Sequence, residues 1–243
     1  MRGLILAAGR GSRMNSLTEH RPKCLQALRG RTLLSYQEEA LRHLGVDQLG
    51  IVTGYLRQTL QMDGWIEFHN DRWAQTNMVS SLMCASYWLR TDTCLVSYSD
   101  IFYFGKYLLP ILDAPGDIVV AYDPDWLNLW SMRFGNPLDD AETFRIDGNN
   151  VIQEIGLKPS ELSQIGGQYM GILRFSPYAW SVVEDVCASI DDLDNLQMTQ
   201  LLQRLITDER VDVRAWAYRG LWGEVDHESD LRLYESSMFD FPS

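Results

Sequence analysis

Short apolar runs alternate with segments of helical spacing through the first half of the chain. The runs are continuous and contain few polar residues, as in strands that are covered on both faces. The longer segments between them carry apolar residues three and four positions apart, which is typical of helices. This order predicts an α/β fold with a doubly wound, mostly parallel sheet. The predicted strands are residues 4–8, 49–53, 93–99 and 118–122, and the predicted helices are residues 32–44 and 77–89.

The middle of the chain has a different pattern. Residues 123–175 are rich in aromatic and polar side chains and contain Gly-Asn-Pro and Asp-Gly-Asn-Asn turn signals. We predict a small mixed subdomain there, made of short strands and loops, which covers one edge of the sheet as a lid. Regular spacing then returns and predicts a helix at 197–208 and a strand at 213–225. The pattern therefore indicates a single domain over residues 1–243, with the lid as an insert.

Three segments with glycine or polar residues follow directly on predicted strands. A glycine loop begins at Gly9, a Gly-Tyr pair stands at Gly54 and Tyr55, and an aspartate stands at Asp100. The carboxyl ends of parallel strands meet at one edge of a sheet, where open α/β folds bind their ligands. We therefore expect these three segments to converge on one site.

The glycine loop has a sequence suited to binding phosphate. Residues 6–14 read Leu-Ala-Ala-Gly-Arg-Gly-Ser-Arg-Met, and an Arg-Pro-Lys-Cys-Leu segment follows at 21–25. Backbone N–H groups of such a loop can close on phosphate oxygens, while Arg13 and Lys23 supply positive charge. Met14 stands where a dinucleotide fingerprint needs its third glycine, and the chain contains no P-loop pattern. The loop therefore predicts a phosphate site of another kind.

Charge and composition narrow the range of partners. The 243-residue chain has a formal net charge of −12 and a sequence pI of about 4.7, so its surface would repel nucleic acid backbones. No apolar run approaches the ~20 residues that cross a bilayer. The four cysteines show no metal-ligand spacing with the four histidines, and the chain begins with a predicted strand. We expect a cytoplasmic protein that binds neither nucleic acid nor membrane.

Together with further motifs, the glycine loop resembles that of nucleotidyltransferases of the sugar-phosphate and phosphocholine type. The other motifs are Gly54-Tyr55, Asn70-Asp71, and Thr76-Asn77 followed by Ser80-Ser81-Leu82, which is typical of the bacterial phosphocholine cytidylyltransferase-like branch. The resemblance implies a nucleotide-diphospho-sugar transferase-like variant of the Rossmann fold, with these segments around the base and ribose of CTP. For Thr76 and Asn77, capping of the following helix is the other interpretation. The implied nucleotide-binding residues are Leu6, Ala7, Ala8, Gly9, Gly11, Gly54, Tyr55, Thr76, Asn77 and Ser81.

Two aspartates close predicted strands in contexts that resemble those of the same family. Asp100 follows Ser-Tyr-Ser, and Asp226 follows Trp-Gly-Glu-Val. In the family, aspartates in these contexts hold Mg²⁺ against the α-phosphate, and Mg²⁺ prefers one or two carboxylates together with phosphate oxygens and water. The resemblance therefore implies Mg²⁺ as the cofactor and these two aspartates as its ligands. It also implies Arg13 and Lys23 as the remaining catalytic residues.

Aromatic and acidic side chains of the predicted lid indicate where the second substrate binds. Aromatic faces beside carboxylates suit an amine or a quaternary ammonium group. Arg133 could pair with Asp139 or Asp140, or it could receive the carboxylate of an amino-acid phosphate. Lys158 is a candidate partner for the acceptor's phosphate, and ordinary packing of the lid is the alternative for each residue. The predicted acceptor-binding residues are Trp130, Arg133, Asp140, Glu142, Lys158 and Tyr169, with Tyr122, Trp126 and Asp139 beside them.

These residues predict a cytidylyltransferase that moves CMP from CTP to the phosphate of a small metabolite and releases pyrophosphate. Phosphocholine or a related phosphorylated amine or amino acid is the expected acceptor. Two alternatives stay open: transfer to a sugar 1-phosphate, and a non-catalytic nucleotide-binding regulatory subunit that kept the fold. The intact pair Asp100 and Asp226 counts against the second, because a binding module needs no metal carboxylates. The sequence leaves open whether the protein is a monomer or a homodimer.

Overall fold

The core of the structure is a seven-stranded sheet in the order β12-β8-β11-β6-β1-β4-β5. The computed structural model describes residues 1–236 and 238–242. Every neighbouring pair in this sheet is parallel except those made by β11, which runs antiparallel to both β6 and β8. The predicted α/β fold with a mostly parallel sheet is confirmed. The strands are β1 (Arg2–Ala7), β4 (Gln48–Thr53), β5 (Ile66–His69), β6 (Cys94–Tyr98), β8 (Ile118–Asp123), β11 (Gln168–Phe175) and β12 (Val213–Ala217).

Antiparallel pairs of short strands and a set of helices surround this sheet. The pairs are β2 (Ala27–Leu28) with β3 (Arg31–Thr32), β7 (Ile101–Tyr103) with β13 (Trp222–Glu224), and β9 (Phe144–Ile146) with β10 (Ile152–Ile155). The α-helices are α1 (Leu33–His43), α2 (Met78–Met83), α3 (Ser86–Thr91), α4 (Gly105–Leu108), α5 (Trp126–Arg133), α6 (Pro177–Ala188), α7 (Met198–Asp208) and α8 (Glu228–Glu235). Within the described residues, none of these helices has the length and apolar character needed to cross a membrane.

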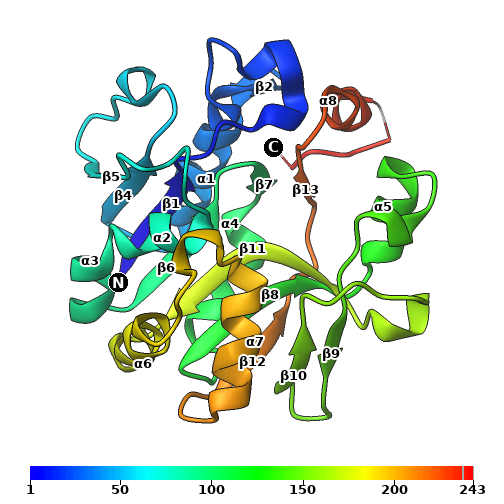
Figure 1. Cartoon of the computed structure of the whole chain (residues 1–243). Helices are drawn as coiled ribbons and strands as arrows, with labels where there is room; N and C mark the ends of the chain where they lie inside the picture. The colour runs from blue at the N-terminus through cyan, green and yellow to red at the C-terminus, as the bar shows by residue number, and fades with distance from the viewer. Residues whose placement is uncertain (237, 243) are drawn as a thin grey trace.

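Helices cover both faces of the sheet, which explains why its strands are apolar throughout (Figure 1). In β1, Ile5 and Ala7 pack on the face covered by α1, α4, α5 and α8. Leu4 and Leu6 of the same strand pack on the opposite face, with α2, α3, α6 and α7. Successive side chains of a strand point to opposite faces, so a strand between two helical layers has to be apolar at every position.

The helix predicted at 77–89 is divided into α2 and α3. Cys84 and Ala85 separate the two helices, and Ala85 is fully buried. Ser81 Oγ and Cys84 Sγ each donate to a main-chain carbonyl one turn earlier. Such side-chain bonds compete with the helix's own hydrogen bonds and bend it, which accounts for the break.

The strand predicted at 213–225 is also divided, into β12 and β13. β12 joins the central sheet, whereas β13 pairs with β7. The chain turns between them at Gly220, where a Cβ would lie 2.3 Å from the ring of Tyr107. Because of this turn, β13 pairs with β7, and the end of β13 lies near the carboxyl end of β6.

The predicted lid is shorter than residues 123–175. Its α5 and its β9–β10 hairpin do lie outside the central sheet (Figure 1). β11, however, occupies the middle of the sheet between β6 and β8, and its Ile172, Leu173 and Phe175 are fully buried. A strand that pairs on both sides belongs to the core. The part of the insert outside the sheet therefore ends before Gln168.

Candidate active site

The glycine loop after β1 folds back on itself and lies against Lys23. Gly11 has a φ of +65°, a left-handed conformation that glycine adopts without strain. Its carbonyl oxygen accepts hydrogen bonds from Met14 N and Thr18 Oγ1. A Cβ at Gly11 would lie 3.2 Å from the stem of Lys23, so glycine also lets the lysine pass close to the loop. The loop and the lysine are therefore positioned together.

Lys23 and Arg13 meet the two aspartates that were predicted to bind the metal. The buried ammonium of Lys23 lies 2.9 Å from Asp100 Oδ2 and 2.6 Å from Asp226 Oδ1. Arg13 Nη2 lies 2.6 Å from the same Asp226 oxygen, and 54% of its side chain is exposed. Burial would lower the pKa of Lys23, but the two carboxylates outweigh it and raise that pKa above its ordinary value. The four residues predicted to be catalytic thus form one charged cluster.

Pairing of two short strands brings the aspartates together. Asp100 stands between β6 and β7, and Asp226 follows β13. Because β13 pairs with β7, Val225 N donates to the carbonyl oxygen of Asp100 at 2.8 Å. Burial would raise the pKa of Asp226, but the surrounding lysine and arginines hold that pKa below its usual range. Two residues far apart in the sequence are therefore fixed in contact, with Asp226 ionised.

Glu224 is a third carboxylate of this cluster, and the sequence analysis did not select it. Oxygens of Asp100, Glu224 and Asp226 lie within 4.8 Å of one another. Shielding from water, with Asp226 beside it, raises the pKa of Glu224 to about 8. Asp100 Oδ1 is buried and has no hydrogen-bond partner among the described residues. A compact set of carboxylate oxygens with one oxygen unused fits Mg²⁺, a hard ion that prefers such ligands.

Arg133 lies behind this cluster, which corrects its predicted place in the acceptor pocket. Its side chain is 0% exposed, and its nitrogens lie 3.0 Å from Glu224, 3.3 Å from Asp226 and 3.2 Å from Asp230. Its partners are thus not the acids at 139–140. A guanidinium that is bound on three sides by the protein is not available to a substrate carboxylate. The sequence indicated that acids were near, but not which of them the arginine would meet.

Most of the aromatic residues predicted to face the acceptor belong to the core. Trp130 is fully buried, and Trp126 and Tyr122 are nearly so. The ring of Tyr122 stacks on Phe144 at a centroid distance of 5.1 Å, and Trp130 packs against Trp222 at 6.0 Å. Burying a large ring stabilises the fold by more than a single exposed cation contact would. Tyr122, Trp126 and Trp130 are therefore packing residues of the core and do not form a ligand site.

Gly54 and Tyr55 join the glycine loop, as predicted. Tyr55 N donates to the carbonyl oxygen of Ala8 at 2.9 Å, which ties the end of β4 to the end of β1. A Cβ at Gly54 would lie 2.6 Å from that same oxygen and 2.5 Å from Trp73 Cβ, so only glycine fits. Leu6 and Ala7, the last two residues of β1, have buried side chains.

Asn70 organises the next predicted nucleotide-binding segment. Its buried Nδ2 donates to Thr76 Oγ1 at 2.9 Å and to Ser81 Oγ at 3.0 Å. Asn77 caps α2, because its Oδ1 accepts from Met78 N at 2.8 Å, so the capping interpretation is correct for Asn77. Asn77 also lines a cavity beside the carboxylate cluster. Asn77 can therefore cap the helix and line the cavity at the same time.

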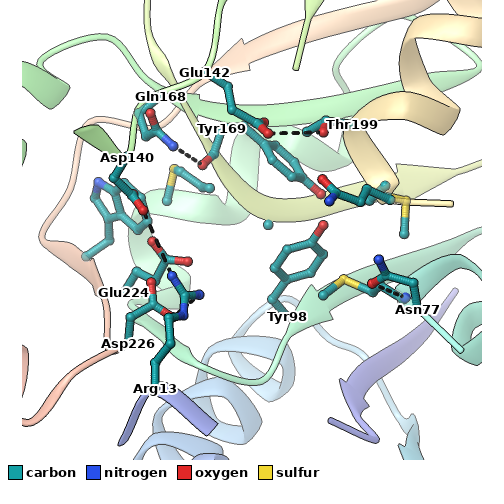
Figure 2. Close-up of a pocket in the computed structure, with 16 residues that line it drawn as sticks. Arg13, Asn77, Tyr98, Asp140, Glu142, Gln168, Tyr169, Thr199, Glu224 and Asp226 are labelled. Carbon is teal, nitrogen blue, oxygen red and sulfur yellow. Dashed lines mark hydrogen bonds and ion pairs between the residues drawn. The ribbon is translucent and has the colours of Figure 1, made fainter. Parts of the chain in front are cut away.

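That cavity has a volume of about 270 Å³. Its lining residues come from segments far apart in the sequence, among them Arg13, Tyr98 and Glu142, which are labelled in Figure 2. Asp140, Glu142 and Tyr169, three of the predicted acceptor-binding residues, line it. Burial raises the pKa of Glu142, which accepts only a long hydrogen bond, 3.5 Å from Thr199 Oγ1. Among the described residues, no lysine, arginine or histidine forms an ion pair with Glu142. Lining residues that were not predicted from the sequence include Tyr98, Gln197, Thr199, Trp222 and Glu224.

Lys158 lies outside this cavity, which does not support a contact with the acceptor's phosphate. Its ammonium donates to the main-chain oxygens of Leu138 and Asp139, and so fixes the loop after α5. Arg13 is the cation that lines the cavity within the described part of the chain. Sequence position alone could not distinguish a lysine that caps a loop from one that binds phosphate.

Comparisons with known proteins agree with this geometry. Residues 3–141 match the family model of the MobA-like NTP transferase domain. A CTP:phosphoglutamine cytidylyltransferase of Campylobacter jejuni is 33% identical over 251 residues, which cover 96% of this chain and 98% of that protein. A choline-phosphate cytidylyltransferase of Streptococcus pneumoniae is 36% identical over 88 residues, which cover 34% of this chain and 38% of that protein.

Two solved structures share the fold over almost the whole chain. The CTP:phosphocholine cytidylyltransferase from Streptococcus pneumoniae has a TM-score of 0.74 at 22% identity and covers 96% of this chain and 97% of its own. The inositol-1-phosphate CTP transferase from T. maritima has a TM-score of 0.77 at 19% identity and covers 96% and 93%. At these identities the structures support the fold alone. Because the family model spans more than half of the chain and the C. jejuni relative nearly all of it, this chain belongs to the nucleotidyltransferases with a MobA-like NTP transferase domain.

Proposed function

We propose that this protein is a Mg²⁺-dependent cytidylyltransferase that transfers CMP from CTP to the phosphate of a small metabolite carrying a cationic amino group. Its family membership and its likeness to a cytidylyltransferase over nearly the whole chain support the reaction class. The convergence of Arg13, Lys23, Asp100 and Asp226 supports the site of reaction.

The reaction needs no nucleophile from the protein. An oxygen of the acceptor's phosphate attacks the α-phosphorus of CTP and forms the new P–O bond. The bond from that phosphorus to the bridging oxygen breaks, and pyrophosphate leaves with the electron pair. The acceptor's phosphate, with a second pKa near 6, is already largely ionised at pH 7, so no general base has to remove a proton. Catalysis then depends on alignment and on neutralisation of charge.

The charged cluster can supply both requirements. Mg²⁺ held by Asp100, Glu224 and Asp226 would supply charge neutralisation at the α-phosphate. Arg13 is half exposed at the cavity, where its planar fork can bind phosphate oxygens in pairs. Lys23 is buried beneath the loop and provides a fixed positive charge at the carboxyl end of β1.

One observation indicates the class of acceptor: the carboxylate of Glu142 lines the cavity without a cationic partner in the described part of the chain. A shielded carboxylate is costly unless it is paired, so a ligand with an amino group would satisfy it. Tyr98 and Tyr169 meet edge to face beside it and offer ring faces to the same cation. The C. jejuni relative is named for phosphoglutamine, which carries such a group.

A neutral sugar phosphate fits these observations less well. Its hydroxyls could accept from or donate to the cavity, but none would neutralise Glu142. Arg133 is also committed to carboxylates of the protein, so recognition by the acceptor's amino group carries more weight than recognition by a carboxylate.

A pyrophosphate-release assay tests this proposal. The four NTPs are each combined with phosphoglutamine, phosphocholine, glucose 1-phosphate and inositol 1-phosphate, with and without Mg²⁺. We expect turnover with CTP, Mg²⁺ and one of the two nitrogen-containing acceptors. Robust turnover with glucose 1-phosphate and none with either cationic acceptor would contradict the assignment of Glu142. A preference for UTP or GTP would contradict the cytidylyltransferase assignment itself.

A further inference from the structure

The buried Arg133 forms ion pairs with three carboxylates at the carboxylate cluster. Nη1 lies 3.0 Å from Glu224, Nη2 lies 3.3 Å from Asp226, and Nε lies 3.2 Å from Asp230. Its guanidinium lies over the rings of Trp130 and Phe134, at 4.8 and 4.9 Å from their centroids. A planar fork held against two rings offers its donors in fixed directions.

The two oxygens of Asp226 face different kinds of cation. Oδ1 contacts Lys23 and Arg13, of which Arg13 lines the cavity. Oδ2 contacts Arg133, which is completely buried. A substrate phosphate in the cavity can therefore reach Arg13 on Oδ1, whereas the cation on Oδ2 stays with the protein. Arg133 is the permanent counter-ion of this carboxylate.

Arg133 also reaches Asp226 through the backbone. Asp230 Oδ2 accepts from the main-chain N–H groups of Asp226 and His227, both at 2.8 Å, and so fixes the start of α8. Arg133 Nη2 donates to that same Asp230 oxygen at 3.3 Å. Side chain and backbone of Asp226 are thus both oriented by contacts that include Arg133.

The position of Arg133 in the chain links this arrangement to the acceptor side. It is the last residue of α5, and the loop that follows carries Asp140 and Glu142 into the cavity. Arg13 Nη1 lies 3.9 Å from Asp140 and so connects that loop back to the cluster. Movement of the end of α5 would therefore disturb both the carboxylates and the acceptor loop.

We infer that Arg133 is a positioning residue that orients Asp226 and Glu224 for the metal ion and couples the acceptor loop to them. This inference rests on the proposed function only in assuming that these carboxylates bind a metal. The opposing explanation is that Arg133 stabilises the fold and has no specific effect on the metal site. The two explanations differ in what a conservative substitution does to metal binding.

The test compares Arg133→Lys with a matched control, Arg174→Lys. Arg174 donates to four main-chain carbonyls at the opposite end of β11 from Tyr169, so the control also replaces a structural arginine. Mn²⁺ binding is followed by the EPR signal of the free ion, with and without CTP, and melting temperature is measured in parallel. A lysine keeps the charge but cannot reach three carboxylates, so we expect Arg133→Lys to weaken Mn²⁺ binding about 10-fold or more. The control should melt earlier and bind Mn²⁺ as the wild type does.

A double-mutant cycle separates positioning from general destabilisation. In the Asp226→Asn background, Arg133→Lys should reduce turnover by much less than it does in the wild type, because the carboxylate that it orients is gone. If Arg133→Lys fails to fold, Asp230→Asn is the second variant. It removes the carboxylate that connects Arg133 to the main chain of Asp226, and it should weaken Mn²⁺ binding in the same way. Unchanged Mn²⁺ affinity in both variants, or full additivity in the cycle, would overturn the inference. So would the absence of Mn²⁺ binding by the wild type. Mn²⁺ binding without cytidylyl transfer would instead refute the proposed function and leave the role of Arg133 intact.

Discussion

The proposed nucleotide side and the proposed acceptor side of the site are built in different ways. The nucleotide side uses backbone and small residues at the ends of β1 and β4, where Gly11 and Gly54 allow close approaches. The acceptor side uses side chains from elements scattered along the chain, such as Asp140, Tyr169 and Thr199. A local sequence pattern can specify the first kind of surface, whereas only the finished fold assembles the second. The carboxylates and Arg13 are shared by both sides.

The largest effect is expected at the shared centre. Asp100→Asn and Asp226→Asn should each reduce turnover by on the order of 10²–10³-fold, because both remove charge from the metal site. Turnover is measured by pyrophosphate release at limiting and saturating Mg²⁺, and folding by thermal melting. If a folded Asp100→Asn protein kept near wild-type turnover at limiting Mg²⁺, the centre would not be shared in the way described.

Arg13 is expected to show the next largest effect. Arg13→Ala should reduce turnover by on the order of 10²-fold through lost stabilisation of phosphate charge. Arg10→Ala is a suitable control, because Arg10 is in the same loop but is exposed and lies over the ring of Tyr55. Equal losses in the two variants would mean that the loop needs positive charge in general and not the fork of Arg13.

Glu142 gives the sharpest contrast between the two sides. Glu142→Gln should raise the KM for the acceptor about 10-fold, which is the loss of roughly 1.4 kcal/mol of interaction, and leave the KM for CTP unchanged. Glu154→Gln on β10 is the control, since Glu154 pairs with Arg145 on the hairpin. A matching rise in the KM for CTP would show that Glu142 does not belong to the acceptor side alone.

The smallest kinetic effect is expected at Trp130. Because this ring is fully buried, Trp130→Phe should lower the free energy of unfolding by roughly 1–2 kcal/mol and leave both KM values unchanged. Chemical denaturation and steady-state kinetics measure the two quantities. A raised KM for the acceptor without a loss of stability would instead support the original prediction that Trp130 binds the acceptor.

The same contrast explains what could be predicted from the sequence. The glycine loop, Asp100 and Asp226 were found because each follows a strand, and strand ends converge in this fold. Glu224 offered a signal that was not used: it ends a strand two residues before Asp226, and alternate residues of an extended chain point to the same side.

Other residues offered no usable signal. Trp130 and Arg133 lie on a short helix whose buried face depends on contacts with β13 and α8, which come much later in the sequence. Thr199 could be assigned to a helix, but not to the cavity at which that helix begins. The role of a side chain could not be predicted where its partners come from remote segments of the chain. The spacing of apolar residues indicates which side chains are buried, but not which residues they contact.

The antiparallel strand β11 has a consequence for how the chain becomes folded during synthesis. β6 and β8 both lie within residues 3–141, the segment that matches the family model, yet they never pair with each other. β11 comes later in the chain and bonds to both of them. Until it has left the ribosome, β8 has no partner in the sheet and one edge of β6 is open. A strand edge in that state is prone to pair with other chains. The segment that matches the family model therefore cannot form the complete sheet, which closes only when β11, in the last third of the chain, arrives.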